Sequence, residues 1–221
     1  TTSGETLTFS GSGTVSSANV QNNQSITLGS ITIADGSGGG LASNYNLTTG
    51  TFDISQKWVS VSGQKIYDAT TTVSSSDLEV TGEVTGESIS ITGTGSVTDK
   101  NVGSGKTIDI SGLSLSDGSH SASNYTIGTT SFAITRRNLS ISGEKVYDGT
   151  GTVLASQIDT VNTAGGETLT ISGEGSVSLP SVGTNKSITL NTLGISNGTS
   201  GTIGLASNYT LDSGSFDITT K

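Results

Sequence analysis

The side chains that could carry out catalysis are few and widely separated in this sequence. A catalytic triad needs a general base, and the single histidine, His120, has no counterpart in the corresponding segments elsewhere in the chain. Paired carboxylates could hydrolyse a glycosidic bond without histidine, but the acidic residues are scattered and most lie beside glycine, where turns place them. We therefore expect no enzymatic activity and no catalytic residues.

The oxygen-bearing side chains offer a cation site as the other kind of chemistry. Asp99, Asn101 and Gly103 have the alternate spacing of a partial acidic loop that binds Ca²⁺, and Asp117 is a second candidate ligand. The third copy of this segment has Leu-Pro-Ser at residues 179–181 instead, and no bidentate glutamate follows at the expected distance. The same residues also suit ordinary turns, so we expect no cofactor, with calcium as the alternative.

The elements that would position these residues are copies of one another. A block that begins with Gly-Glu and ends with Gly occurs at residues 4–11, 86–93 and 166–173, with a period of about eighty residues. A Ser-Asn-Tyr motif follows each block; its residues are Asn44 and Tyr45, Asn124 and Tyr125, and Asn208 and Tyr209. We interpret these tyrosines, together with Tyr67 and Tyr147 of a second recurring motif, as core residues with hydrogen-bonded hydroxyls. Copying of one unit is typical of a spacer or a multivalent surface.

The composition and the apolar pattern predict an all-β fold. Glycine is abundant at 32 residues, only 30% of the residues are hydrophobic, and these alternate with polar ones, as in Ile108 and Ile110. No segment has helical periodicity or the apolar length of a membrane span. We predict an elongated tandem array of three β-sandwich-like repeats of about eighty residues. These are residues 1–57, which lack the opening strand and are incomplete, 58–137 and 138–221.

The net charge restricts the classes of partner, and the residue types that the chain lacks bear on disulfides and on its origin. A net charge of -9 argues against nucleic acid and against anionic membrane surfaces, and we expect no membrane insertion. The chain has no cysteine, so no disulfide can form. Because it also has no methionine, we expect it to be a processed or excised piece of a longer protein.

A segment of variable length precedes each Ser-Asn-Tyr motif. It comprises residues 37–42, 119–122 and 199–206, whose lengths differ in steps of two. Adding one residue to each arm of a hairpin would do this and keep every later side chain on its face, so we predict an antiparallel hairpin of variable reach. Loops that vary on a constant scaffold are where binding would occur. The candidate binding residues are Gly38, Leu41, His120, Thr199 and Ile203.

Each complete repeat opens with a short strand and a Lys-x-Tyr-Asp motif. The motif residues are Lys65, Tyr67 and Asp68 in the middle repeat, and Lys145, Tyr147 and Asp148 in the third. The aspartate precedes a small residue and a threonine, which favours a turn in which its carboxylate accepts a hydrogen bond from a backbone N–H.

Together with residues 99–106, the Ser-Asn-Tyr motif and the linker 134–140, this motif resembles the YDG domain. That domain occurs in tandem in large bacterial surface proteins, alongside the similar "mostly beta, glycine-rich" domains of haemagglutinin-like adhesins. The chain departs from the pattern at Ala69, which replaces the motif glycine, and at residues 179–181. The resemblance implies a secreted, exposed segment that serves cell adhesion or biofilm formation, and it implies no catalytic activity.

These observations lead to one predicted function and two alternatives. We predict a structural stalk segment of a secreted bacterial surface adhesin or extracellular filament, whose partners are neighbouring repeats of the same or an identical chain. The first alternative is a filament subunit joined by donated strands, since a repeat without its opening strand has an unpaired edge. The second is a module that binds a host or cell-surface glycan or protein through the variable loops.

Overall fold

The computed structural model describes residues 1–2 and 4–221, and it confirms the all-β prediction. Every described helix is a single turn of 3-10 helix, at Ala42–Asn44, Ser75–Asp77, Ala122–Asn124, Ala155–Gln157, Ala164–Gly166 and Ala206–Asn208. The strands are β1 (Leu7–Ser10), β2 (Gln21–Ser25), β3 (Thr32–Asp35), β4 (Thr51–Ile54), β5 (Lys57–Ile66), β6 (Thr72–Ser74), β7 (Leu78–Thr81), β8 (Ile89–Ser96), β9 (Gly103–Lys106), β10 (Leu113–Asp117), β11 (Tyr125–Thr135), β12 (Arg137–Val146), β13 (Thr152–Leu154), β14 (Ile158–Val161), β15 (Leu169–Ser172), β16 (Glu174–Val177), β17 (Gly183–Thr189), β18 (Gly194–Asn197) and β19 (Tyr209–Thr219). No helix in the described part is long and apolar enough to cross a membrane.

The chain forms two compact units, which divide the middle repeat. Unit 1 comprises residues 1–60, 80–91 and 115–129, and unit 2 comprises residues 61–79, 92–114 and 130–221. The strands of the middle repeat form the orders β7-β5-β11-β9 and β10-β8-β6. Several of these strands, β5 and β11 among them, begin in unit 1 and end in unit 2.

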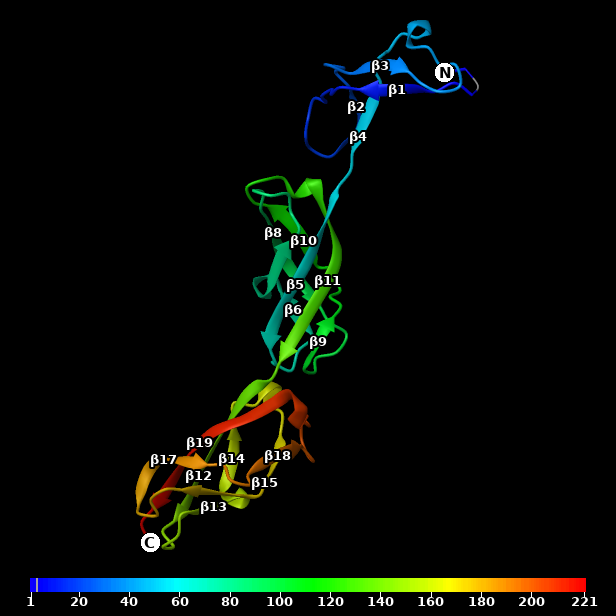
Figure 1. The fold of residues 1–221 in the computed structure, drawn as a ribbon. Coiled ribbons are helices and arrows are strands. Elements are labelled where there is room, and N and C mark those ends of the chain that lie inside the picture. Colours follow the sequence, from blue (N-terminus) through cyan, green and yellow to red (C-terminus); the bar gives the residue numbers. More distant parts are fainter. Residues whose placement is uncertain (3) are drawn as a thin grey trace. The chain divides into compact units, whose positions relative to one another are not determined.

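The third repeat, within unit 2, has a complete core under a six-stranded sheet. The strand order is β13-β16-β17-β19-β12-β14, and the pair β15-β18 forms a separate antiparallel ribbon (Figure 1). The first and last strands, β12 and β19, are parallel neighbours, with Arg137 opposite Tyr209 and Val146 opposite Thr219. Alternate residues of these strands face inward, so the apolar positions gather on one side. The buried cluster is Ile141, Val153, Ile158, Val177, Ile188, Leu193, Phe216 and Ile218.

The first repeat, within unit 1, contains only β1 to β4 among the described residues. They form two antiparallel pairs, β1-β3 and β2-β4. Phe52 of β4 is 53% exposed, whereas its counterparts Phe132 and Phe216 are 1% and 0% exposed. The core residues of unit 1 come from the middle repeat, where Val59, Ile89 and Tyr125 pack together. The first repeat therefore leaves its own apolar residues partly uncovered.

The backbone geometry requires glycine at the last position of each Gly-Glu block. Gly11, Gly93 and Gly173 have φ angles of 89°, 92° and 90°, which side chains rarely adopt. A Cβ at these positions would lie 2.1, 2.2 and 2.1 Å from a backbone carbonyl oxygen of the facing segment. Only glycine allows this close approach, so the last glycine of each block marks a backbone contact that is present in every repeat.

The variable segments do not form the predicted hairpins. β3 ends at Asp35, and after the loop the chain turns into the 3-10 helix Ala42–Asn44 rather than into a partner strand. The Asp35 carboxylate accepts a hydrogen bond from the Ala42 N–H at 2.7 Å and closes the loop. Asp117 and Asn197 close the other two loops in the same way, through the N–H groups at residues 122 and 206. A side-chain acceptor thus replaces the backbone ladder that the hairpin prediction required.

Candidate functional site

The two most regular motifs of the sequence meet in space, because the Ser-Asn-Tyr tyrosine binds the glutamate of the Gly-Glu block. The Tyr209 hydroxyl donates to Glu167 at 2.8 Å, Tyr125 donates to Glu87, and Tyr45 donates to Glu5. Each hydroxyl also accepts a backbone N–H, as Tyr209 does from residue 164 at 3.1 Å. The hydroxyl of each of these tyrosines therefore donates one hydrogen bond and accepts another.

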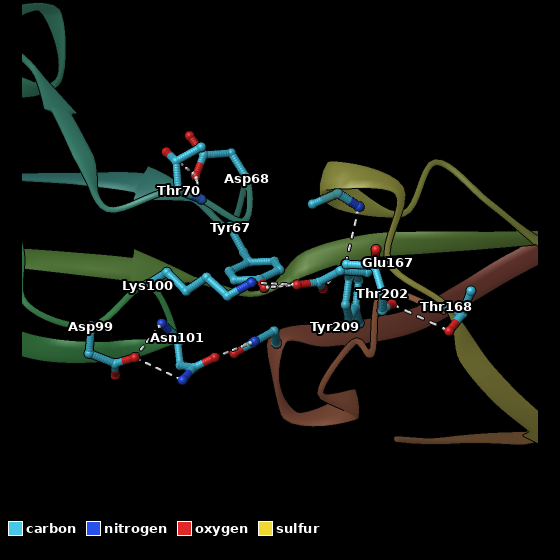
Figure 2. Close-up of polar contacts among 12 residues, drawn as sticks. Tyr67, Asp68, Thr70, Asp99, Lys100, Asn101, Glu167, Thr168, Thr202 and Tyr209 are labelled. Atoms are coloured by element: carbon cyan, nitrogen blue, oxygen red, sulfur yellow. Dashed lines mark hydrogen bonds and ion pairs between the residues drawn. The ribbon is translucent and has the colours of Figure 1, made fainter. Parts of the chain in front are cut away.

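In unit 2 this pair is part of a larger cluster, which we call the second joint (Tyr67, Lys100, Asn101, Val102, Glu167, Asn208 and Tyr209). The Glu167 carboxylate also accepts hydrogen bonds from the Tyr67 hydroxyl and the Lys100 ammonium, both at 2.7 Å. Figure 2 shows Tyr67 and Lys100 converging on this carboxylate. The rings of Tyr67 and Tyr209 meet edge to face, with centroids 5.5 Å apart. The middle and third repeats are thus tied together through one buried acid.

The asparagine of the Ser-Asn-Tyr motif forms the second half of the second joint. Asn208 is 1% exposed, and its side-chain oxygen accepts the N–H of Val102 at 2.9 Å. Its amide group donates to the side-chain oxygen of Asn101 at 2.8 Å. An asparagine can use both ends of its amide in this way, so a single side chain fixes the backbone of the Asp-Lys-Asn-Val segment.

The same asparagine contact recurs in unit 1, at what we call the first joint (Ala18, Asn19, Val20, Glu87, Asn124 and Tyr125). The Asn124 side-chain oxygen accepts the N–H of Val20 at 2.9 Å, and its amide group donates to Asn19, also at 2.9 Å. Ala18 stands where the second joint has Lys100, and the first repeat has no Lys-x-Tyr-Asp tyrosine. A cavity of about 130 Å³ borders Ala18, Glu87 and Asn124.

The electrostatics of the second joint keep Glu167 ionised. Burial raises the pKa of the Glu167 carboxyl, but the hydrogen bonds from Lys100, Tyr67 and Tyr209 outweigh it, and the net pKa lies below its usual value. The pKa of Tyr67 is raised by burial and by its bond to Glu167. The hydrogen bond to Glu167 also raises the pKa of Lys100. The cluster is therefore a buried carboxylate, fully supplied with donors, beside a partly exposed ammonium group.

The Lys-x-Tyr-Asp motif is a self-contained turn in both complete repeats. The Lys145 ammonium, whose side chain is 3% exposed, donates to the Thr150 carbonyl at 2.9 Å and the Thr152 carbonyl at 2.7 Å and pairs with Asp148 at 3.1 Å. Lys65 makes the same contacts with residues 68, 70 and 72. The Asp148 carboxylate accepts the Thr150 N–H at 2.9 Å, and this bond, with the Lys145 bond, lowers its pKa to about 2. The motif lysine thus holds the turn that presents the motif tyrosine.

The tyrosine of that motif has two environments. Tyr67 is 0% exposed within the second joint, whereas Tyr147 is 42% exposed, so the prediction of a core position is wrong for Tyr147. The N–H of each donates at 2.9 Å to a carbonyl of the last strand of its own repeat, at Thr135 and at Thr219. The backbone therefore presents both tyrosines alike, and burial depends on whether a Glu-Tyr pair lies opposite.

The calcium candidates occupy turns. Asp99 accepts hydrogen bonds from the backbone and side chain of Asn101 and from Lys106 at 3.1 Å, and these bonds lower its pKa. Asp117 closes the loop at residue 122. Among residues 1–2 and 4–221, no three His, Cys, Asp or Glu side chains gather as metal ligands would.

The loop candidates lie at the surface of their units. Leu41 and Ile203 are 49% and 54% exposed, and Thr199 is exposed as well. Gly38 has a φ of 69° and lies against the Gly4 carbonyl. The His120 Nδ1 lies 2.9 Å from the Ser119 hydroxyl, and its Nε2 lies 4.0 Å from Glu87.

The sequence interpretation missed the residues that complete the joints. Glu87, Glu167 and Lys100 were not among its candidate residues, although Gly-Glu recurs as regularly as Ser-Asn-Tyr. Two motifs that recur with equal period and constant order are candidates for mutual contact, and this signal could have paired Glu167 with Tyr209. Nothing in the spacing could have paired Tyr67 with Glu167, because they belong to different repeats and lie 100 residues apart.

Comparison with known proteins identifies the repeated unit. The sequence pattern of the YDG domain matches residues 55–132 and again residues 135–216. The boundaries predicted from the repeats were 58 and 138. No curated protein and no solved structure matches the chain. Because the two matches together cover more than half of its length, the chain belongs to the YDG domain family.

Proposed function

We propose that this chain is a load-bearing stalk segment of a secreted bacterial surface adhesin or extracellular filament, without enzymatic activity of its own. The observation that carries the proposal is the arrangement of the third repeat, whose first strand, β12, is the parallel neighbour of its last strand, β19. Tension along the chain would enter at the start of β12 and leave at the end of β19. In parallel neighbours these points lie at opposite ends of the pair, so the hydrogen bonds are loaded in shear and must break together.

The joints support the same proposal. The asparagine contact to a backbone N–H occurs in both joints at the same distance, 2.9 Å. Contacts of this kind between repeats limit bending where a flexible glycine-serine linker would permit it. A net charge of -9 favours solubility and opposes non-specific association of exposed repeats.

Single-molecule pulling through engineered cysteines tests the mechanical part, because the chain has no cysteine of its own. The shear variant carries Asn138→Cys and Thr219→Cys, at opposite ends of the β12-β19 pair. The control variant carries Val146→Cys and Thr219→Cys, which face each other at one end. We expect a clearly higher unfolding force for the shear variant, and equal forces would contradict a load-bearing role.

The location is tested on intact cells of the source bacterium with an antibody raised against the purified chain. We expect labelling of unpermeabilised cells and its loss after brief treatment with external protease. Labelling that requires permeabilisation would contradict the proposed surface location while leaving the mechanical result unaffected.

A further inference from the structure

A polar groove lies over the sheet β7-β5-β11-β9, and all of its lining residues belong to unit 2. It measures about 640 Å³, which falls in the range of roughly 300–1,000 Å³ that small-molecule sites occupy. One wall is the turn at Asp77 with the start of β7, and the other is the bulge of β9 at Gly105. The middle repeat has both its opening strand, β5, and its last strand, β11, so the groove is not the gap of a missing strand.

The bulge has a side-chain acceptor in the other two repeats. In the third repeat the Asp217 carboxylate accepts the N–H of Asn185 at 2.7 Å. In the first repeat the Asp53 carboxylate accepts the N–H of Asn23 at 2.6 Å. The backbone has the same left-handed conformation in all three bulges, with φ angles of 57° at residue 23, 69° at Gly105 and 53° at residue 185. An aspartate on the last strand therefore closes the bulge in the first and third repeats.

The middle repeat has neither of these two side chains at its bulge. Gly105 stands in place of the asparagine, and Ala133 stands in place of the aspartate. A methyl group cannot accept a hydrogen bond, so the Gly105 N–H lacks the carboxylate acceptor that its counterparts have. Gly105 is exposed, and a Cβ at this position would meet no atom of the described residues within 4 Å. The groove therefore offers a backbone donor to a ligand oxygen, beside the methyl group of Ala133.

The opposite wall of the groove offers acceptors. It carries Asp77 and Glu79, and neither carboxylate forms an ion pair within the described part of the chain. Two carboxylates in a chain with a net charge of -9 repel an acidic ligand. A cationic ligand would satisfy these carboxylates but would bring no acceptor to the Gly105 N–H. The groove therefore suits a neutral ligand that has an acceptor on one side and several donors on the other.

We propose that this groove is a binding site for a neutral glycan that carries acetamido groups. The acetamido carbonyl accepts the Gly105 N–H, as the aspartate carboxylates do in the other repeats, and its methyl group packs against that of Ala133. Hydroxyl groups of the glycan donate to Asp77 and Glu79 in charge-assisted hydrogen bonds. An extended peptide also has a carbonyl, but it brings only one backbone donor per residue, so a glycan matches the wall of two carboxylates better.

The test is titration of the intact, isotope-labelled chain with chitotetraose, a neutral oligomer of N-acetylglucosamine, followed by NMR. We expect saturable shifts of the Gly105 and Ala133 N–H resonances at millimolar ligand. Cellotetraose has a hydroxyl group in place of each acetamido group. It should bind about tenfold more weakly, because it loses the carbonyl contact to the Gly105 N–H and the methyl contact to Ala133.

The decisive variant is Ala133→Asp, which gives the middle repeat the aspartate of the other two. Its carboxylate should accept the Gly105 N–H, slow the hydrogen exchange of that N–H about tenfold and abolish binding of chitotetraose. The variant should fold, because Asp53 and Asp217 occupy this position in the other repeats.

A matched pair of variants tests the opposite wall. Glu79→Gln removes a charged acceptor and should weaken binding about fivefold. Asp159→Asn, at the corresponding exposed position of the third repeat, should bind as the wild type does.

Three results would each overturn the proposal. They are the absence of saturable shifts with chitotetraose, equal affinities for chitotetraose and cellotetraose, and binding that Ala133→Asp leaves unchanged. Stronger binding of an acetylated tetra-alanine peptide at the same resonances would also overturn it, by making an extended peptide the occupant.

Discussion

Replacing Glu167 by glutamine should loosen the second joint, including the Tyr209 contacts within the third repeat, and leave the apolar core of that repeat intact. The Glu167 side chain is 1% exposed and accepts hydrogen bonds from Tyr67, Tyr209 and Lys100. Glutamine has nearly the same shape, so the substitution removes the charge and leaves little cavity. The two tyrosine bonds become neutral, and one of them must reverse because an amide nitrogen cannot accept.

The size of the expected loss in free energy follows from the hydrogen-bond partners of Glu167. A hydrogen bond to a charged group contributes about 1.5–3 kcal/mol and a neutral one about 1 kcal/mol, so each tyrosine bond loses roughly 1 kcal/mol. The Lys100 side chain is 39% exposed and can turn to water, so its ion pair adds little to the loss. We expect the free energy of opening the second joint to fall by about 2 kcal/mol, which corresponds to roughly a 30-fold change in the opening equilibrium.

Amide hydrogen exchange measures this opening locally. The N–H of Val102 donates to Asn208 and that of Ala164 donates to Tyr209, so both should exchange roughly 30-fold faster in Glu167→Gln. The Val177 N–H, bonded to Gly151 within the third repeat, should keep its wild-type rate.

A matched control comes from the first joint. Glu87 accepts the Tyr125 hydroxyl, but among the described residues it has Ala18 in place of the lysine and no second tyrosine. Glu87→Gln should therefore speed the exchange of Val20 at most about fivefold, which is about 1 kcal/mol. If Glu167→Gln leaves the Val102 N–H unchanged, or if both variants have equal effects, Glu167 does not hold the second joint.

Three further outcomes are expected. Asn208→Ala should make the Val102 N–H exchange about tenfold faster by removing its acceptor, and an unchanged rate would contradict the asparagine contact. Ala18→Lys should supply Glu87 with the missing ammonium group and slow exchange at the first joint by about two- to fivefold, an effect that 1 M salt should remove. The pKa of Asp148 is lowered from 3.8 to about 2, so its stabilising contribution is complete above pH 3.8 and is lost as the pH falls through 2. The melting temperature of Asp148→Asn should therefore depend less on pH in this window than the melting temperature of the wild type.

The sequence by itself determined the strand class, the repeat and the local turns. Alternation of apolar residues such as Ile108 and Ile110 requires only that one face be buried, and this needs no knowledge of the partner strand. The Lys-x-Tyr-Asp motif likewise closes within a few residues, since Lys145 reaches Asp148 and Thr150 directly. Such contacts depend on short chain separations, so the residue order alone specifies them.

The tertiary structure decided what the sequence left open. The lengths of the variable segments were consistent with a hairpin, but the Asp35 carboxylate takes the place of a strand ladder. The burial of Tyr67 and the exposure of Tyr147 follow from the presence or absence of a Glu-Tyr pair from another repeat, which no local pattern encodes. Glu167 became identifiable as the centre of a joint only when Tyr67, from a different repeat, was seen to lie against it. A contact between repeats joins side chains that reach the surface only when each repeat has folded. The residue order alone therefore does not show which of these side chains meet.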